Sequence, residues 1–361
     1  MTTPTDNSRP FAYRLAIALL RPLLMAFTRR DWSGAEHLPT HGGWLVCTNH
    51  NSHLDVLVFG RVANMRYVSG VPLLWNAGTR PFGPGCVVVR ETEEIYLLST
   101  WDEGVPEEIA HDHLYGITWN PMNYVKVLKE IVAKAEPRRV GTDAMSPLFA
   151  QLIPMAFPNA ELVDGGPAIQ AAKRVKTSEE VDAVRAAVEV AEASLAAAVA
   201  ELRPGVTERE LAAAFMQAMA SQGVTTPARQ DVARFTSPDL VAFNAGVVAD
   251  GYAGEVGRTW PVNGGGDFTR CDALLARLVD ACQAGAPGSA LLDAYGDEPL
   301  PALPIARGLG LGFDDPVIVR DLPETAARER LDPGVVLAVT AAVDRVIATE
   351  VVHITDDGPQ V

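Results

Sequence analysis

The spacing of hydrophobic and polar positions predicts a chain of strands and helices from about residue 55 onward. Short apolar runs bounded by glycine, proline or asparagine are typical of β-strands, and longer stretches with helical periodicity alternate with them. The predicted strands are VLVFG (56–60), MRYVSGV (65–71), CVVVRETEEIYLLS (86–99), RRVGTD (138–143) and NAELVDGG (159–166). The predicted helices of this part are NYVKVLKEIVAKA (123–135) and PLFAQLIPMAF (147–157). The pattern indicates an α/β domain.

Two longer helices follow, and each begins with a recognisable cap. Thr177 with Glu180, and Thr207 with Glu210, have the spacing of a capping box, in which the hydroxyl accepts from the third amide and the carboxylate accepts from the cap amide. Pro204-Gly205 and Gly223 are the expected ends of these helices.

The next segment, LVAFNAGVVADGYAGEVGRTWPV (240–262), predicts a β-hairpin. Asp250-Gly251 supplies the residues of a tight turn, and we expect Asn244 and Glu255 to lie about opposite each other on its two arms. Further strand-like runs are ARGLGL (306–311), LDPGVVLAVT (331–340) and VIATEVVHITDDG (346–358).

These motifs resemble those of the pita-bread family of Xaa-Pro aminopeptidases, prolidases and creatinase. The family hairpin D-x-G-x-x-x-x-G-Y-x-x-D-x-T-R-T is matched at Gly246, Gly251, Tyr252, Arg258 and Thr259. The entry from Arg174 to Ala186 and the opening VLVFGRVANMRYVSG are also similar to it. The resemblance implies an α/β (α+β) fold with a creatinase-type N-terminal domain at 55–176 and a pita-bread domain at 177–361.

In this family two metal ions are held by two aspartates, a histidine and two glutamates, and they activate a bridging water. The resemblance places Asn244 and Glu255 at the aspartates, Arg307 at the histidine, and Thr340 and Thr349 at the glutamates. A guanidinium has no lone pair to give and repels a cation. We therefore expect no metal and no other cofactor, and no metal-dependent peptidase activity.

Creatinase is understood to use the same fold without metal, so a lost metal site leaves two alternatives. The chain is either a metal-independent C–N hydrolase or an inactive homologue that binds a small or dipeptide-like ligand. Glu255, Arg307 and Asp314 are the candidate catalytic residues, and Asn244, Tyr252, Thr340 and Thr349 the candidate substrate-binding residues. A buried arginine needs a carboxylate, so we expect an ion pair between Glu255 and Arg307.

Residues 1–54 resemble instead the start of a bacterial 1-acylglycerol-3-phosphate acyltransferase. Its N-H-x-x-x-x-D motif is matched by Asn49, His50 and Asp55, in which the histidine acts as a base and the aspartate orients it. The phosphate-binding F-P-E-G-T-R block of that family is missing. Acyl transfer through His50 and Asp55 is the alternative function.

The formal net charge of −15 excludes a nucleic-acid partner, which requires a basic face. The four cysteines have no C-x-x-C spacing, which favours a reduced, cytoplasmic location. Five arginines lie among residues 1–30, and two of them, Arg14 and Arg21, interrupt an apolar stretch together with Pro22. Residues 11–30 therefore predict an interfacial helix that touches the inner face of the membrane rather than a span, and the alternative is a helix that packs on its own domain. The family resemblance implies a homodimer.

Overall fold

The computed structural model describes residues 54–71, 85–98, 104–116, 118, 120–133, 135–229, 231–301, 304–321 and 327–361, without the side chains of residues 313 and 314. Residues 41–361 belong to one compact unit. The predicted membrane-facing helix at 11–30 and His50 lie outside the described residues. No helix in the described part of the chain is both long enough and apolar enough to cross a bilayer.

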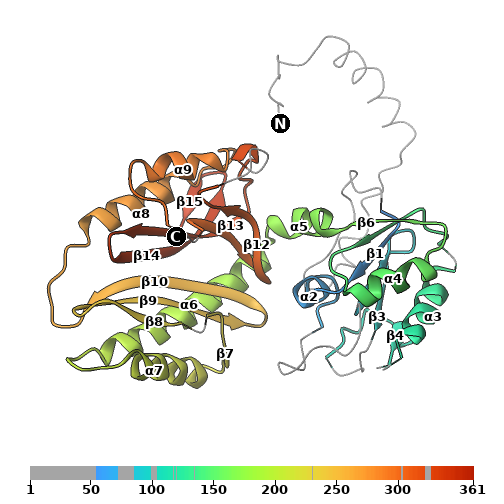
Figure 1. Cartoon of the computed structure of the whole chain (residues 1–361), viewed down its shortest axis with the longest axis horizontal. Helices are drawn as coiled ribbons and strands as arrows, with labels where there is room; N and C mark the ends of the chain where they lie inside the picture. Colours follow the sequence, from blue (N-terminus) through green and yellow to red (C-terminus); the bar gives the residue numbers. More distant parts are fainter. Residues whose placement is uncertain are drawn as a thin grey trace, which may run out of the picture. The chain divides into compact units, whose positions relative to one another are not determined.

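In the described residues of the N-terminal part, six strands form a mixed sheet in the order β4-β3-β2-β1-β5-β6 (Figure 1). The strands are β1 (Val56–Phe59), β2 (Cys86–Val89), β3 (Glu94–Leu98), β4 (Leu114–Tyr115), β5 (Arg139–Thr142) and β6 (Glu161–Asp164). The helices are α2 (Val62–Ser69), α3 (Pro121–Val132), α4 (Pro147–Ala156) and α5 (Gly166–Arg174), with the short 3-10 turn η2 (His111–His113). Strands β1, β5 and β6 are parallel, whereas β1, β2 and β3 pair antiparallel.

Helices cover both faces of this sheet, as the alternating side chains of β1 show. Val56 and Val58 pack toward α3 and α4, whereas Leu57 and Phe59 pack toward α2 and α5. A strand with helices on both sides needs apolar residues at every position, which explains the continuous run VLVF.

The prediction of a strand at 65–71 is wrong, because this segment lies mostly in helix α2. Asp143 accepts hydrogen bonds from the amides of Gly60 and Arg61 at the start of α2, at 2.7 and 3.2 Å. At its other end Gly70 takes the left-handed conformation, with φ of 70°, and its amide donates to the Arg66 carbonyl. The run is apolar enough for either structure, and contacts with a distant aspartate hold the backbone just before the helix.

The C-terminal part is built on a nine-stranded sheet of the described residues, in the order β12-β11-β13-β14-β10-β9-β7, with β15 beside β14 and β8 beside β9. The strands are β7 (Thr226–Pro227), β8 (Ala233–Ser237), β9 (Leu240–Ala249), β10 (Tyr252–Pro261), β11 (Ala306–Gly310), β12 (Gly312–Ile318), β13 (Val336–Val343), β14 (Val346–Thr355) and β15 (Gly358–Gln360). The helices are α6 (Ser178–Ala200), α7 (Glu208–Ser221), α8 (Thr269–Ala281) and α9 (Ser289–Tyr295).

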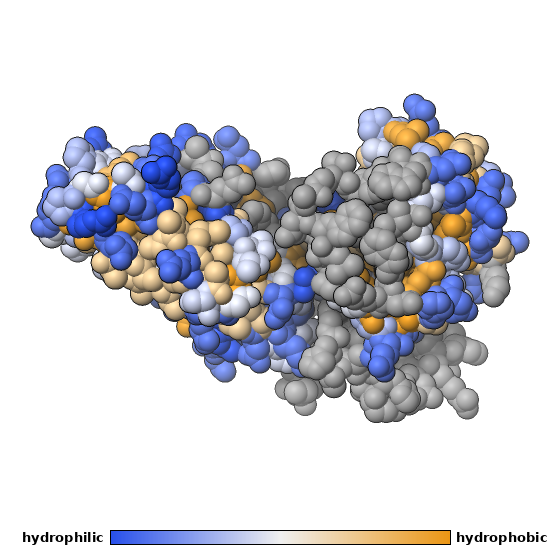
Figure 2. Space-filling model, turned by 90° about the horizontal axis from the view of Figure 1, so that it is seen from below, coloured by the Kyte–Doolittle hydropathy of each residue, from blue (hydrophilic) through white to orange (hydrophobic). Residues whose placement is uncertain are grey.

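Two helix pairs bury one face of this sheet. Helices α6 and α7 pack on β9 and β10 through Phe243 and Val256, among others, and α8 and α9 pack on β13 and β14. Both predicted capping boxes are present at the starts of α6 and α7. Seen from below, the surface carries a broad patch of weakly hydrophobic residues (Figure 2).

Candidate functional site

The site is built on the hairpin β9–β10, whose turn fixes the register. Asp250 and Gly251 both have positive φ, at 45° and 84°, so a two-residue turn joins the arms. Asn244 therefore pairs with Gly257, and Glu255 pairs with Gly246. The expectation that Asn244 and Glu255 lie opposite each other is off by two residues, so they are diagonal neighbours on one face.

Strand pairing brings all five aligned positions to that same face, which we call the site face. Thr349 pairs with both Gly257 and Thr340, and Arg307 pairs with Ala338, two residues before Thr340. Directly paired residues share a face of a sheet, and so do residues two apart on a strand. The site face thus carries Asn244, Glu255, Arg307, Thr340 and Thr349.

Glu255 and Arg307 form the predicted ion pair, with Arg307 Nη2 against Glu255 Oε2. The Glu255 side chain is 1% exposed and that of Arg307 11%, so both charges have lost most of their water. Burial of an unpaired charge is very costly, and the ion pair explains how both charged side chains can be buried at this position. Glu255 Oε1 is also buried and has no hydrogen-bond partner among the described residues.

Asn244 is engaged by a second arginine that sequence reasoning missed. With the side-chain amide of Asn244 oriented so that its oxygen faces Arg229, this oxygen accepts hydrogen bonds from Arg229 Nε at 3.2 Å and from Arg229 Nη2 at 3.0 Å. The loss of a negative charge at 244 together with an arginine upstream was the available signal.

The two threonines engage each other, since Thr340 Oγ1 and Thr349 Oγ1 are 2.9 Å apart. Thr349 is fully surrounded, and a Cβ on Gly257 would lie 2.6 Å from its hydroxyl oxygen. Glycine at 257 therefore lets β10 and β14 approach closely at this point.

Glu350, next to Thr349, does not replace the missing glutamate. Its carboxylate pairs with Arg258 Nη2, and Arg258 Nη1 donates to the Thr349 carbonyl at 2.7 Å. Adjacent strand residues point to opposite faces, so this geometry confirms that Glu350 faces away from the site.

Other predicted site residues are not brought into this group. Tyr252 lies on the opposite face of β10 from Glu255, and its hydroxyl donates to Glu180 Oε1 at 3.4 Å. Burial and the Glu180 charge raise the pKa of Tyr252, which keeps it a neutral hydrogen-bond donor. Asp314 lies on β12, where its backbone pairs with Gly308, and its side chain is outside the described residues.

Asp55 has a structural role in the N-terminal sheet. Its Oδ2 accepts from the backbone amides of Arg138 at 2.7 Å and Arg139 at 3.0 Å, which ties the start of β1 to the start of β5. A carboxylate oxygen that holds two backbone amides is not arranged to orient an imidazole. The acyltransferase alternative is therefore left without support at the one motif residue that the structure describes.

The donors on the site face do not fit two divalent cations. They comprise one carboxylate already paired with a guanidinium, one amide oxygen bound by another, and two hydroxyls bound to each other. Divalent metals in such sites require several anionic oxygens or imidazoles, and Arg307 adds a positive charge at close range.

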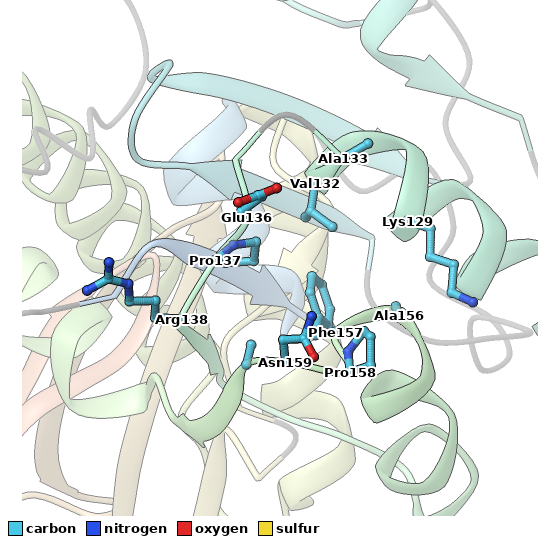
Figure 3. A pocket seen from close by; sticks show the side chains of 11 residues that line it. Lys129, Val132, Ala133, Glu136, Pro137, Arg138, Ala156, Phe157, Pro158 and Asn159 are labelled. Carbon is cyan, nitrogen blue, oxygen red and sulfur yellow. The ribbon is translucent and has the colours of Figure 1, made fainter.

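The N-terminal sheet has a separate hollow of about 460 Å³ at the ends of α3 and α4. Phe157 and Val132 form its buried floor, and in Figure 3 the ends of Lys129 and Arg138 extend away from it on opposite sides. None of the predicted site residues lines this hollow.

Comparisons with known proteins agree with this architecture. Residues 182–357 match the family model of metallopeptidase family M24, and residues 49–175 match that of the creatinase/prolidase N-terminal domain. Creatinase from Bacillus sp. (strain B-0618) is 25% identical over 203 residues, which are 55% of this chain and 47% of creatinase. Xaa-Pro aminopeptidase from Escherichia coli (strain K12) is 26% identical over 159 residues, 38% of this chain and 36% of the enzyme. The matches thus span about half of the first relative and about a third of the second.

Solved structures show the same fold at lower identity. The prolidase from Pyrococcus horikoshii OT3 has a TM-score of 0.68 at 18% identity, covering 85% of this chain and 93% of the prolidase. The X-Pro aminopeptidase from Thermotoga maritima MSB8 has a TM-score of 0.67 at 16% identity, covering 85% of this chain and 94% of that one. With both of its domains matched in order, the chain belongs to the pita-bread family of Xaa-Pro peptidases, prolidases and creatinase.

Proposed function

We propose that this chain is a metal-independent member of its family whose site face binds a small zwitterionic or dipeptide-like ligand and does not hydrolyse it by the two-metal route. The observation that carries the proposal is the ion pair of Glu255 with Arg307, which puts a guanidinium where the family has a histidine ligand. Chemistry that needs a metal-activated water has no metal-binding set here.

The same arrangement supports recognition of a small ligand. Arg307 and Arg229 are donors suited to a carboxylate, and the buried Glu255 Oε1 is an acceptor without a partner in the described residues. A ligand with both an anionic and a cationic group would satisfy both kinds of side chain. Amino acids, dipeptides and guanidino acids have this chemistry.

A metal-independent C–N hydrolase is the second candidate. The same unpartnered oxygen of Glu255 and the similarity to creatinase favour it. In this case Glu255 would accept a proton from the ligand, and Arg307 would hold the Glu255 carboxylate in position.

Thermal shift with turnover assays separates these functions. The full chain is screened against amino acids, Xaa-Pro dipeptides and creatine, and each stabilising compound is then incubated with the protein and examined for cleavage. Stabilisation without products, lost in Arg307→Leu, supports the binding function. Chelator-resistant cleavage that is lost in Glu255→Gln supports the hydrolase, and cleavage that a chelator abolishes contradicts both.

Cytoplasmic location, contact of residues 11–30 with the inner membrane face and homodimer formation remain predictions. Light scattering on the purified chain measures the oligomeric state, and sedimentation with anionic lipid vesicles measures the membrane contact. Removal of residues 1–40 should abolish vesicle binding if the arginines of this segment carry it.

A further inference from the structure

A second cavity, of about 360 Å³, lies between α6 and β14, with β15 at one side. Its volume falls within the range of about 300–1,000 Å³ that is typical of small-molecule sites. None of the five aligned positions lines this cavity.

Five valines form the apolar wall of the cavity. Val181, Val184 and Val188 come from one side of α6, and Val336 and Val351 come from β13 and β14. Val184 and Val336 are each 2% exposed, whereas Val188 and Val351 are half-buried. The wall suits a short branched aliphatic group, whose burial contributes about 0.8 kcal/mol per CH₂.

His353 places an imidazole in the wall of this cavity. Its Nδ1 is buried and has no hydrogen-bond partner among the described residues. Burial and the nearby charge of Arg185 lower the pKa of His353, so the ring is neutral at pH 7. With the proton on Nε2, the Nδ1 lone pair is available to a donor on the ligand.

The remaining polar groups also favour a ligand that donates. Arg185 is already paired with Asp182 at 2.6 Å, and Glu350 is paired with Arg258. Glu189 and Glu192, exposed on the same side of α6, have no ion pair within the described part of the chain. Besides the exposed amide of Gln360, which can donate or accept, the groups left to bind a ligand are two carboxylates and an imidazole nitrogen, which are acceptors.

We propose that this cavity binds a small organic cation, specifically a primary ammonium group on a branched aliphatic body. The valines take the aliphatic body, and the ammonium donates to His353 Nδ1 and neutralises part of the charge of Glu189 and Glu192. A carboxylate ligand would face the same two glutamates and would be repelled.

The proposal is tested by calorimetric titration of the full chain with 3-methylbutylammonium. The matched probes are 3-methylbutanol and 3-methylbutanoate, which keep the branched body and remove or reverse the charge. We expect the ammonium to bind at least tenfold more tightly than either. Equal binding of the three probes, or no ammonium binding at millimolar concentration, overturns the proposal.

Variants locate the binding. Val188→Phe fills the cavity from a half-buried position and should abolish binding, and the double change Glu189→Gln with Glu192→Gln should weaken it severalfold. Glu201→Gln removes the same charge at the exposed end of α6, outside the cavity, and should leave binding unchanged. Ammonium binding that survives both cavity variants contradicts the proposed site, and an unchanged melting temperature of each free variant shows that folding is intact.

Discussion

At the scale of single residues, the site face consists of internal pairs. Glu255 has Arg307, Asn244 has Arg229, and the two threonines have each other. The Glu255–Arg307 pair could be predicted because a buried charge demands an opposite one. The signal for Arg229 was weaker, because an arginine in a loop is usually solvated and only the fold brings this one to Asn244.

We expect Arg307→Leu to destabilise the chain by about 3 kcal/mol, because it leaves the buried Glu255 carboxylate unpaired. Exposed charge deletions, such as Glu91→Gln, stay within about 0.5 kcal/mol. Adding Glu255→Gln to Arg307→Leu should recover part of the loss. Denaturant unfolding measures the parent, both single variants, the double variant and Glu91→Gln. A double variant no more stable than the sum of the two single changes would rule out the coupling.

Asp55→Asn should lower the free energy of unfolding by about 1–3 kcal/mol, since the amide group accepts less strongly from the two backbone amides of β5. The acyltransferase hypothesis predicts an unchanged stability and a lost transferase activity. Unfolding curves of this variant beside Glu91→Gln, with a lysophosphatidate assay, decide between the two roles.

His353 gives the chain a pH-dependent stability. Its pKa is lowered in the folded state from an ordinary value of 6.5, by burial and by Arg185, while Glu189, Glu192 and Glu350 line the same cavity. The unfolded chain then binds the proton more tightly, so the stabilising contribution is complete above about pH 6.5 and is lost as the pH falls toward the folded pKa. His353→Gln should reduce this part of the pH slope in unfolding experiments, and an identical slope would contradict it.

At the scale of elements, prediction succeeded where the signal is local. Both capping boxes and the Asp250-Gly251 turn depend on residues within a few positions of one another, and all three are present. It failed for α2, because the backbone just before this helix is held by Asp143, about eighty residues away in sequence. The expected pairing of Asn244 with Glu255 was off by two residues, because the two-residue turn determines the register of the hairpin.

The contact between β10 and β14 is a further element-scale feature, because they pair only at Gly257–Thr349 and Arg258–Ala348 within the described residues. Gly257→Ala places a methyl group 2.6 Å from the Thr349 hydroxyl and should cost about 1–3 kcal/mol by overpacking. Thr349→Ala in the same chain should relieve most of this cost. Hydrogen exchange of the β14 amides reports the local effect. Equal protection of these amides in Gly257→Ala and in the parent would contradict overpacking at this contact.

At the scale of the whole molecule, the two matched domains account for the described fold. The predicted domain boundary between residues 54 and 55 would separate Leu54 from the core of the N-terminal domain. Leu54 is 6% exposed and packs with Leu57 and Phe59 in the core of the N-terminal sheet. Its Cδ1 also lies close to Gly141 on β5. A chain that begins at Asp55 lacks this side chain.

We therefore predict different outcomes for two truncations. A chain without residues 1–40 keeps the whole unit from His41 to Val361 and should retain one cooperative transition at an unchanged temperature. A chain without residues 1–54 should also fold, but with a loss of at least about 2 kcal/mol, because removing a buried leucine typically costs 2–5 kcal/mol. Leu54→Ala in the full chain separates the contribution of this residue from that of the segment. If the longer truncation is as stable as the shorter one, Leu54 contributes nothing to the core; if the shorter one already loses its transition, the first forty residues are part of the folded unit.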